Sequence, residues 1–232
     1  MTARFDEVRG NCLAFFGFWV YQMFWVFLCS MPVIYVNAME GQLGRANMSP
    51  PLGVWDYLGW ALFACGTLMQ IVADVQKYKF RSNPENRGMF CQVGLWNWSR
   101  HPNYYGEMLI WIGAFLCVAP FFAVPNLSGA AVAAGATTIL SPLFTIFVLT
   151  RLSGLPTCEG KYLSRYFKNG NGDAWEDYAR RTAPIILQPQ CLYYALPVCV
   201  KRAFCCEWAS LAYKKELQPL GGDAESSEVR GV

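Results

Sequence analysis

The stretch from Gly94 to Trp111, GLWNWSRHPNYYGEMLIW, combines a turn with polar groups that could bind a ligand. His101 is the only histidine in the chain, and Pro102 favours extended backbone before it and a helix start at its own position. Glu107 follows Asn103 by four residues, about one helical turn. A carboxylate within an apolar segment is costly unless it is paired or lines a polar cavity. The stretch therefore predicts a polar site at the entrance of a membrane helix.

Further polar residues lie at the ends of apolar segments, on the same side of the predicted membrane. Basic groups there could bind phosphate through their N–H donors, and acids and amides could accept hydrogen bonds from ribose hydroxyls or a ligand amide. The combination suits a phosphorylated, adenine-containing ligand. The residues are Gln70, Asp74, Lys77, Lys79, Arg81, Arg100, His101, Asn103, Tyr104, Glu107, Arg151, Glu159, Arg180 and Arg181.

These side chains also have explanations that need no soluble ligand. The basic residues could contact anionic lipid head groups, and Asp74 and Glu107 could form ion pairs with Arg81 or Arg100. His101 could donate a proton, since its ordinary pKa is about 6.5. The interpretation that we favour is a hydrogen bond from His101 to the backbone or to Glu107 that stabilises the turn. Neither a GxGxxG sequence nor a P-loop is present, so a bound nucleotide would be held by helices and their loops. We also expect no metal ion.

The composition indicates a protein of the lipid bilayer. Apolar residues make up 54% of the 232 residues and charged residues only 15%, against about 25% in an average soluble domain. The net charge of +3 gives no support for nucleic-acid binding. The ten cysteines are spread through apolar segments without CxxC pairs, which predicts buried free thiols.

Four apolar segments are long enough to cross a bilayer, which takes about 20 residues each. They predict an all-α, multi-pass transmembrane helical bundle with a cytosolic helical segment after the last span. A proline at position 142 predicts a kink in the fourth span. The predicted spans are residues 14–36, 53–75, 104–124 and 130–152, within one domain of residues 1–187. Residues 188–214 predict an interfacial amphipathic segment and residues 215–232 a disordered tail.

The distribution of basic residues predicts the orientation. The loops before the second span and after the third contain Arg45 as their only basic residue. The segments after the second and fourth spans contain many more: Lys77, Lys79, Arg81, Arg87 and Arg100, then Arg151, Lys161, Arg165 and Lys168. Because basic loops stay on the cytosolic side, both termini and the His101 motif are predicted to face the cytosol.

The motif GLWNWSRHPNYYGE, with ADVQKYKFR upstream and LTRLSGLP and WEDYARRT downstream, resembles the steroid 5-alpha-reductase C-terminal-domain family over residues 4–187. The wider superfamily includes the isoprenylcysteine and phospholipid methyltransferases, which share the RHPxYxG block. The resemblance implies an integral membrane protein of lipid metabolism, with the endoplasmic reticulum as its location in a eukaryote. It also implies NADPH, held by the membrane helices, as the cofactor.

The matching motif positions imply which residues bind that cofactor. Gln70 takes the place of an Asn in the steroid reductases. Asp74 and Arg81 fall in the A-D-x-Q element and just beyond it, and Asn103 and Glu107 fall in the N-x-x-G-E element. The full implied set is Gln70, Asp74, Arg81, Arg100, His101, Asn103, Tyr104, Glu107, Arg151, Glu159, Tyr178 and Arg181.

Three functions remain open from the sequence. The first is an NADPH-dependent reductase of an activated C=C bond in a lipophilic, steroid-like or isoprenoid substrate. The acid and tyrosine that engage the substrate carbonyl in the steroid reductases come from N-terminal helices without a match here, so no catalytic residue is assigned and the chain is interpreted as N-terminally short. The second is a methyltransferase that uses S-adenosylmethionine, which the RHPxYxG block and Glu159 favour. The third is a truncated family member without activity.

Overall fold

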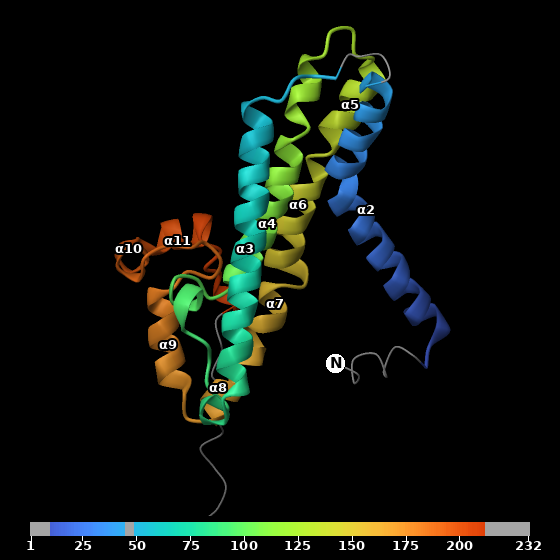
Figure 1. Ribbon diagram of the computed structural model, residues 1–232. Coiled ribbons are helices and arrows are strands. Elements are labelled where there is room, and N and C mark those ends of the chain that lie inside the picture. Colours follow the sequence, from blue (N-terminus) through green and yellow to red (C-terminus); the bar gives the residue numbers. More distant parts are fainter. Residues whose placement is uncertain (1–9, 45–48, 212–232) are drawn as a thin grey trace, which may run out of the picture.

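A computed structural model of the chain describes residues 10–44 and 49–211. Every regular element within these residues is a helix and none is a strand, which confirms the all-α prediction. Four helical stretches are long and apolar enough to cross a membrane, as predicted (Figure 1). They are Cys12–Leu43, Val54–Ser82, Pro102–Ala123 and Gly129–Cys158.

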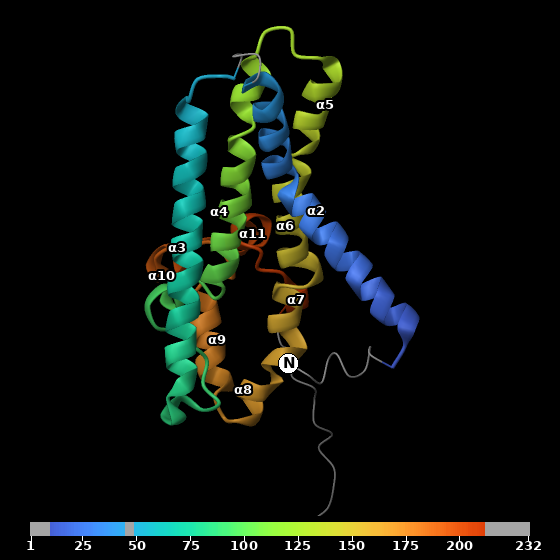
Figure 2. The same cartoon turned by 45° about the vertical axis from the view of Figure 1, so that its right-hand side comes forward.

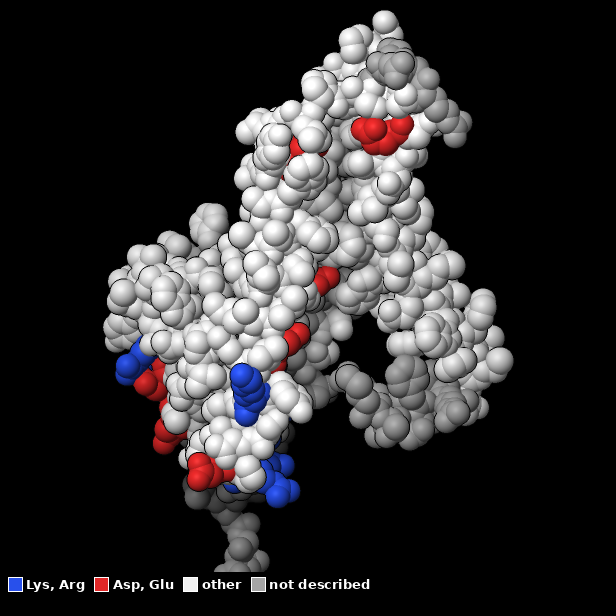
Figure 3. Space-filling model, in the orientation of Figure 1, with Lys and Arg blue, Asp and Glu red and all other residues white. Residues whose placement is uncertain are grey.

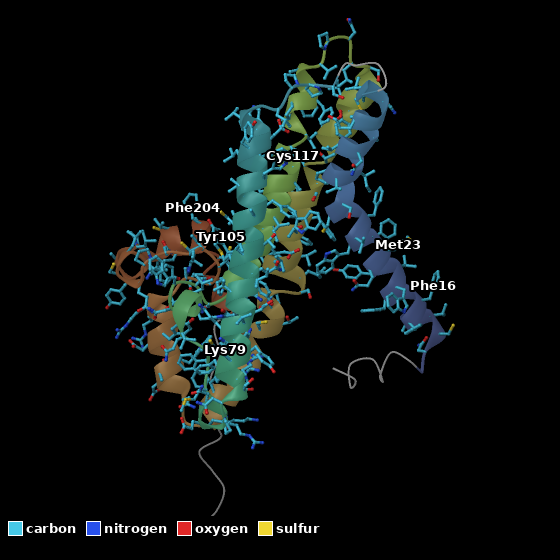
Figure 4. The ribbon with its side chains drawn as sticks, viewed as in Figure 1. Phe16, Met23, Lys79, Tyr105, Cys117 and Phe204 are labelled. Atoms are coloured by element: carbon cyan, nitrogen blue, oxygen red, sulfur yellow. The ribbon has the colours of Figure 1, made fainter. Side chains whose placement is uncertain are left out.

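The first span, α2 (Cys12–Leu43), begins at Asn11, whose side-chain oxygen accepts from the backbone N–H groups of Leu13 and Ala14. Pro32 lies inside this helix, where it removes a backbone hydrogen bond and crowds the preceding turn. The half of α2 before the proline leaves the bundle (Figures 1 and 2). Phe16 and Met23 lie on that half, and their side chains are exposed to the predicted bilayer (Figure 4).

The second and third spans, α3 (Val54–Ser82) and α4 (Pro102–Leu116), form the most extensive helix–helix contact of the described residues. Glycines at two levels bring the two backbones together. A Cβ on Gly66 would lie 2.5 Å from the carbonyl oxygen of Gly106, and one on Gly113 would lie 2.5 Å from that of Gly59. Small residues allow such close approach in membrane helices, so these glycines set the register of α3 against α4.

The helix ends differ from the predicted span ends: the first helix continues past residue 36 to Leu43, and the third begins at Pro102. The second span does not end at residue 75 but continues to Ser82, because the first strong helix breaker is the Asn83-Pro84 pair. The fourth span is interrupted at Thr138 and Ile139, as expected from Pro142, which cannot donate to the Thr138 carbonyl oxygen four residues before it. It consists of α5 (Gly129–Thr137), α6 (Leu140–Phe147), the π-helix η5 (Val148–Leu152) and α7 (Leu155–Cys158), and Pro142 is the third residue of α6, where it needs no backbone N–H.

The remaining helices are short and form a group beside the lower part of the bundle, away from the diverging half of α2 (Figure 1). They are α8 (Ser164–Lys168), α9 (Gly172–Arg181), α10 (Gln190–Ala195) and α11 (Val198–Phe204). An aromatic core of Phe90, Leu163, Tyr166, Trp175 and Tyr178 joins α8 and α9 to the loop before α4. All ten cysteines are free, as predicted, but only Cys29 and Cys205 are buried within the protein. The predicted tail at 215–232 lies outside the described residues.

Candidate functional site

Two polar pairs join α3 to α4 below the glycine contacts. Gln70 Nε2 donates to Glu107 Oε2 at 2.5 Å, and Trp111 Nε1 donates to Glu107 Oε1 at 2.8 Å. One turn further along α3, Asp74 Oδ1 accepts a hydrogen bond from Asn103 Nδ2 of α4 at 3.3 Å. Neither acid forms the ion pair considered from the sequence; within the described residues their partners are neutral N–H donors.

The loop that leads into α4 is fixed against α3 and against the segment after α9. Trp96 Nε1 donates to the carbonyl oxygen of Ala73 at 2.9 Å, which attaches the loop to α3. The buried Ser99 hydroxyl donates to the carbonyl oxygen of Ile185 at 2.7 Å and accepts from the backbone N–H of His101 at 3.2 Å. These contacts hold residues 99–101 in place at the start of α4.

A buried charge cluster follows from this placement. Arg100 Nη1 donates to Glu159 Oε2 at 3.1 Å, and His101 Nε2 lies 3.0 Å from Glu159 Oε1. The three residues are 5%, 7% and 1% exposed. The hydrogen bond predicted from His101 to the backbone or to Glu107 is not the one found; the partner of the imidazole is Glu159, because Glu107 lies six residues further along, nearly two turns deeper, against α3.

Burial and the neighbouring charges set the protonation of this cluster. Burial lowers the pKa of His101 below its ordinary value, so the imidazole is neutral at pH 7. Burial alone would raise the pKa of Glu159, but the Arg100 guanidinium and the hydrogen bond with His101 lower it. Because an ionised carboxylate can only accept hydrogen bonds, His101 Nε2 carries the imidazole proton and donates a hydrogen bond to Glu159. Burial would lower the pKa of Arg100, but Glu159 and Glu207 raise it, so Arg100 stays charged.

A cavity of about 270 Å³ opens next to the cluster. Its basic lining residues are Lys77, Arg81, Arg100 and Arg165, and its aromatic ones are Phe90, Trp96, Tyr166, Trp175 and Tyr178. Lys77 Nζ lies 4.3 Å from the centre of the Trp96 ring, and Arg165 Cζ lies 4.7 Å from the centre of the Tyr166 ring. None of the described lining residues is acidic, so the cavity has the charge and the flat surfaces that suit a phosphorylated aromatic ligand.

The two predicted tyrosines lie near this cavity. The Tyr104 ring stacks on His101 with the ring centres 5.0 Å apart, and its hydroxyl lies 3.2 Å from Cys158 Sγ. Tyr178 lines the cavity and donates from its hydroxyl to the carbonyl oxygen of Trp96. Burial raises the pKa of Tyr178, so this hydroxyl stays protonated.

Eight of the twelve predicted cofactor residues do not line this cavity: Gln70, Asp74, Asn103, Tyr104, Glu107, Arg151, Glu159 and Arg181. The Arg151 guanidinium covers the Trp208 ring, with Cζ 3.6 Å from the ring centre. Arg181 pairs with Asp177 at 2.8 Å on the exposed face of α9. The structure thus brings only four of the predicted residues to the lining of this cavity: Arg81, Arg100, His101 and Tyr178.

Several residues of the site were missed by the sequence reasoning. Arg165 was counted only as part of a basic flank, and Trp96 and Phe90 were not assigned to a site. Glu207, which contacts Arg100 at 2.5 Å, lies beyond the predicted transmembrane domain. For Trp96, the GLWNW run beside the His101 motif is a usable signal; for Glu207 the sequence offers none.

The surface charge agrees with the placement of this cavity. The basic side chains visible on this face all lie at the end that holds α8 and α9, where acidic ones stand among them, and the opposite end shows only acidic ones (Figure 3). The basic end is the one predicted to face the cytosol.

Comparisons with known proteins place these features in a family. A family model described as "Protein of unknown function (DUF1295)" matches residues 2–182. A protein of the fission yeast Schizosaccharomyces pombe, named "Uncharacterized protein C594.04c", is 26% identical over 121 residues, which cover 42% of this chain and 35% of that protein. The chain thus spans about a third of that relative's length. No solved structure matches the chain.

Proposed function

Because this chain belongs to the DUF1295 family of steroid 5-alpha-reductase-like membrane proteins, we propose that it is an NADPH-dependent reductase of an activated C=C bond in a lipophilic, steroid- or isoprenoid-like substrate. One observation carries the proposal. The basic, aromatic cavity lies at the end of α3 and α4 where the polar pairs Gln70–Glu107 and Asp74–Asn103 begin. Phosphate-binding groups and amide-binding groups are therefore neighbours along the same two helices.

The side chains fit the chemistry of NADPH. Lys77, Arg81 and Arg165 would bind its phosphates, and the aromatic lining would contact its adenine. Asn103 Oδ1 is a buried acceptor without a hydrogen-bond partner among the described residues. Since buried polar groups are normally satisfied, this atom supports a ligand that supplies an N–H or O–H donor beside α4.

When bound, NADPH supplies a hydride to the electron-poor carbon of the C=C bond. In this proposal Glu107 and Gln70 orient the nicotinamide amide through acceptor and donor groups, and Asp74 accepts from a ribose hydroxyl. Neutral His101, buried and bonded to Glu159, holds the loop that contains Arg100. The group that polarises the substrate carbonyl is not assigned to any residue.

The methyltransferase alternative has less support from the geometry. In that alternative, the Glu159 carboxylate would bind S-adenosylmethionine. One oxygen of Glu159 accepts from Arg100 and the other from His101, and the residue is 1% exposed. Because Glu159 is almost fully buried and Glu107 is only partly buried, a ligand can reach Glu107 more readily than Glu159, which favours the reductase.

Ligand-dependent stabilisation of the purified protein in detergent tests the proposal. A ligand at one hundred times its Kd stabilises the folded state by about 2.7 kcal/mol, enough to raise the melting temperature measurably. We expect NADPH to raise it and S-adenosylhomocysteine to leave it unchanged. Arg81→Ala and Asn103→Ala should reduce the NADPH effect, whereas Arg202→Ala, an exposed basic residue of α11, should not. A shift with S-adenosylhomocysteine alone would establish the methyltransferase instead.

The location is part of the same proposal. The four spans suit an integral membrane protein, and the endoplasmic reticulum is the membrane that we propose in a eukaryotic cell, with both termini in the cytosol. This orientation places the cavity where cytosolic NADPH is available. The apolar side of the bundle would then receive the lipophilic substrate.

A further inference from the structure

The segment from Gln190 to Leu211 continues past the residues that match the family and packs against the candidate site. Tyr193, Cys205 and Leu211 are 1%, 4% and 7% exposed, so the segment is part of the folded core. Leu211 packs in one cluster with Met108 of α4. These contacts fix the segment against the helix that starts at the His101 motif.

Glu207 in this segment holds Arg100 directly. Arg100 Nη2 donates to Glu207 Oε2 at 2.5 Å, and the Tyr193 hydroxyl donates to the same oxygen at 2.5 Å. The Arg100 side chain is only 3% exposed, and its Nη1 is already held by Glu159. Glu159 binds Nη1 and Glu207 binds Nη2, so the two carboxylates together fix the plane of the Arg100 guanidinium.

The next residue, Trp208, supports Arg151, another of the predicted cofactor residues. The backbone just before Glu207 turns sharply, because Cys206 has a φ of +60°, in the left-handed region that non-glycine residues seldom adopt. The turn is held by a hydrogen bond from the Glu207 N–H to the Lys201 carbonyl oxygen at 3.2 Å. A strained backbone conformation of this kind persists only where neighbouring contacts stabilise it, and here the Glu207 N–H hydrogen bond is one such contact.

We propose that Glu207 is a positioning residue of the nucleotide site: it holds Arg100 at the wall of the basic cavity from a segment outside the family match. This inference rests on the proposed function, because it assigns Glu207 a role in NADPH binding. With a carboxylate on each side, Arg100 adds little net charge to the cavity. Its contribution is therefore the orientation of its donors, and that orientation depends on the Glu207 hydrogen bonds more than on the Glu207 charge.

This distinction gives the two substitutions of Glu207 different outcomes. Glu207→Gln retains an oxygen that can accept from Arg100 and Tyr193 but removes the charge. Glu207→Ala removes both hydrogen bonds and leaves Arg100 Nη2 without its acceptor. If orientation matters, only the alanine variant loses affinity. If charge dominated, both variants would bind anionic NADPH more tightly, since a negative charge near the cavity is gone.

The test is a titration of the full chain in detergent with NADPH, together with the melting temperature of the ligand-free protein. We expect Glu207→Ala to weaken the Kd about tenfold, equivalent to about 1.4 kcal/mol, and Glu207→Gln to restore it to within about threefold of the wild type. The matched control is Glu176→Gln, an exposed glutamate on α9 that pairs with exposed Arg180, and its Kd should equal that of the wild type. A purely structural role would lower the melting temperature without this pattern of Kd values.

Two results overturn the inference in different ways. If the wild type binds NADPH and Glu207→Ala binds it equally well, Glu207 does not position Arg100 for the cofactor. If the wild type does not bind NADPH, the proposed function fails and the inference fails with it. Should Glu207→Ala not fold, Tyr193→Phe removes a single hydrogen bond from the Glu207 carboxylate. That variant should weaken NADPH binding about threefold, and an unchanged Kd refutes the positioning role.

Discussion

Replacing Glu107 by Gln should cost the folded protein less than breaking a buried ion pair would, even though the carboxylate lies at membrane depth. Its two oxygens accept from Gln70 Nε2 and Trp111 Nε1, and no cation contacts it among the described residues. In the variant, the new amide oxygen can accept from Trp111. The new amide nitrogen can donate to Gln70 once that side-chain amide turns over, so both neighbours remain satisfied.

The expected cost is the difference between two charge-assisted hydrogen bonds and two neutral ones. Hydrogen bonds to charged groups contribute about 1.5–3 kcal/mol each and neutral ones about 0.5–1.5 kcal/mol, which gives roughly 2–3 kcal/mol for the pair. Glu107→Leu is the contrast, because it leaves the Gln70 and Trp111 donors buried without an acceptor. It should cost more than the Gln variant, since each unsatisfied donor adds about 1–3 kcal/mol.

Reversible denaturant unfolding in detergent micelles, with NADPH-induced melting shifts in parallel, measures both effects. We expect Glu107→Gln to retain a cooperative transition with a smaller loss of stability than the Leu variant, and to show a smaller NADPH shift than the wild type. Breaking a buried ion pair would instead cost about 3–5 kcal/mol. A Gln variant that is as destabilised as the Leu variant, with an undiminished NADPH shift, would refute the reasoning.

Three further predictions follow from the geometry. A cysteine introduced at Asn86 should react with a membrane-impermeant thiol reagent from the cytosolic side of sealed vesicles; labelling only from the lumenal side contradicts the orientation. Because burial lowers the pKa of His101, the unfolded chain binds a proton near pH 6.5 that the folded protein does not, so the melting temperature should fall as the pH drops from 7 to 5. His101→Asn should remove that part of the pH dependence, and an equal slope in both proteins contradicts the assignment. Gly66→Ala places a Cβ about 2.5 Å from the Gly106 carbonyl oxygen and should cost about 1–3 kcal/mol, whereas Gly17→Ala, with no atom within 4 Å, should be neutral in the same melting assay.

The spans and the polar motif could be predicted from the sequence, because both are local patterns. An apolar run of about 20 residues and a proline before a helix need no knowledge of distant segments. The predicted helix ends were less accurate. The helix α3 continues through the mostly polar residues 76–82, because side-chain polarity alone does not end a helix. The four-residue spacing of Gln70 and Asp74 did indicate one shared helix face.

The partners of these residues could not be predicted, because they depend on tertiary packing. His101 and Glu159 are 58 residues apart, and Arg100 and Glu207 are 107 residues apart. No periodicity connects positions so far apart in the chain. The pairing of Gln70 with Glu107 also requires the register of α3 against α4, which the glycines determine. Their seven-residue spacing in both helices, 59 with 66 and 106 with 113, was a signal that the sequence contained.

The glycine contacts have a consequence for how tightly a ligand can bind. They join α3 and α4 at two levels seven residues apart, about 10.5 Å along each axis at 1.5 Å per residue. A contact between backbones has no rotamers, so the spacing of Gln70, Asp74, Asn103 and Glu107 is already fixed in the free protein. A ligand that bridges the two helices need not order them, and it avoids the entropy loss that a mobile site imposes on binding. Affinity at this site is therefore governed by preorganisation of the helix pair as well as by the groups that touch the ligand.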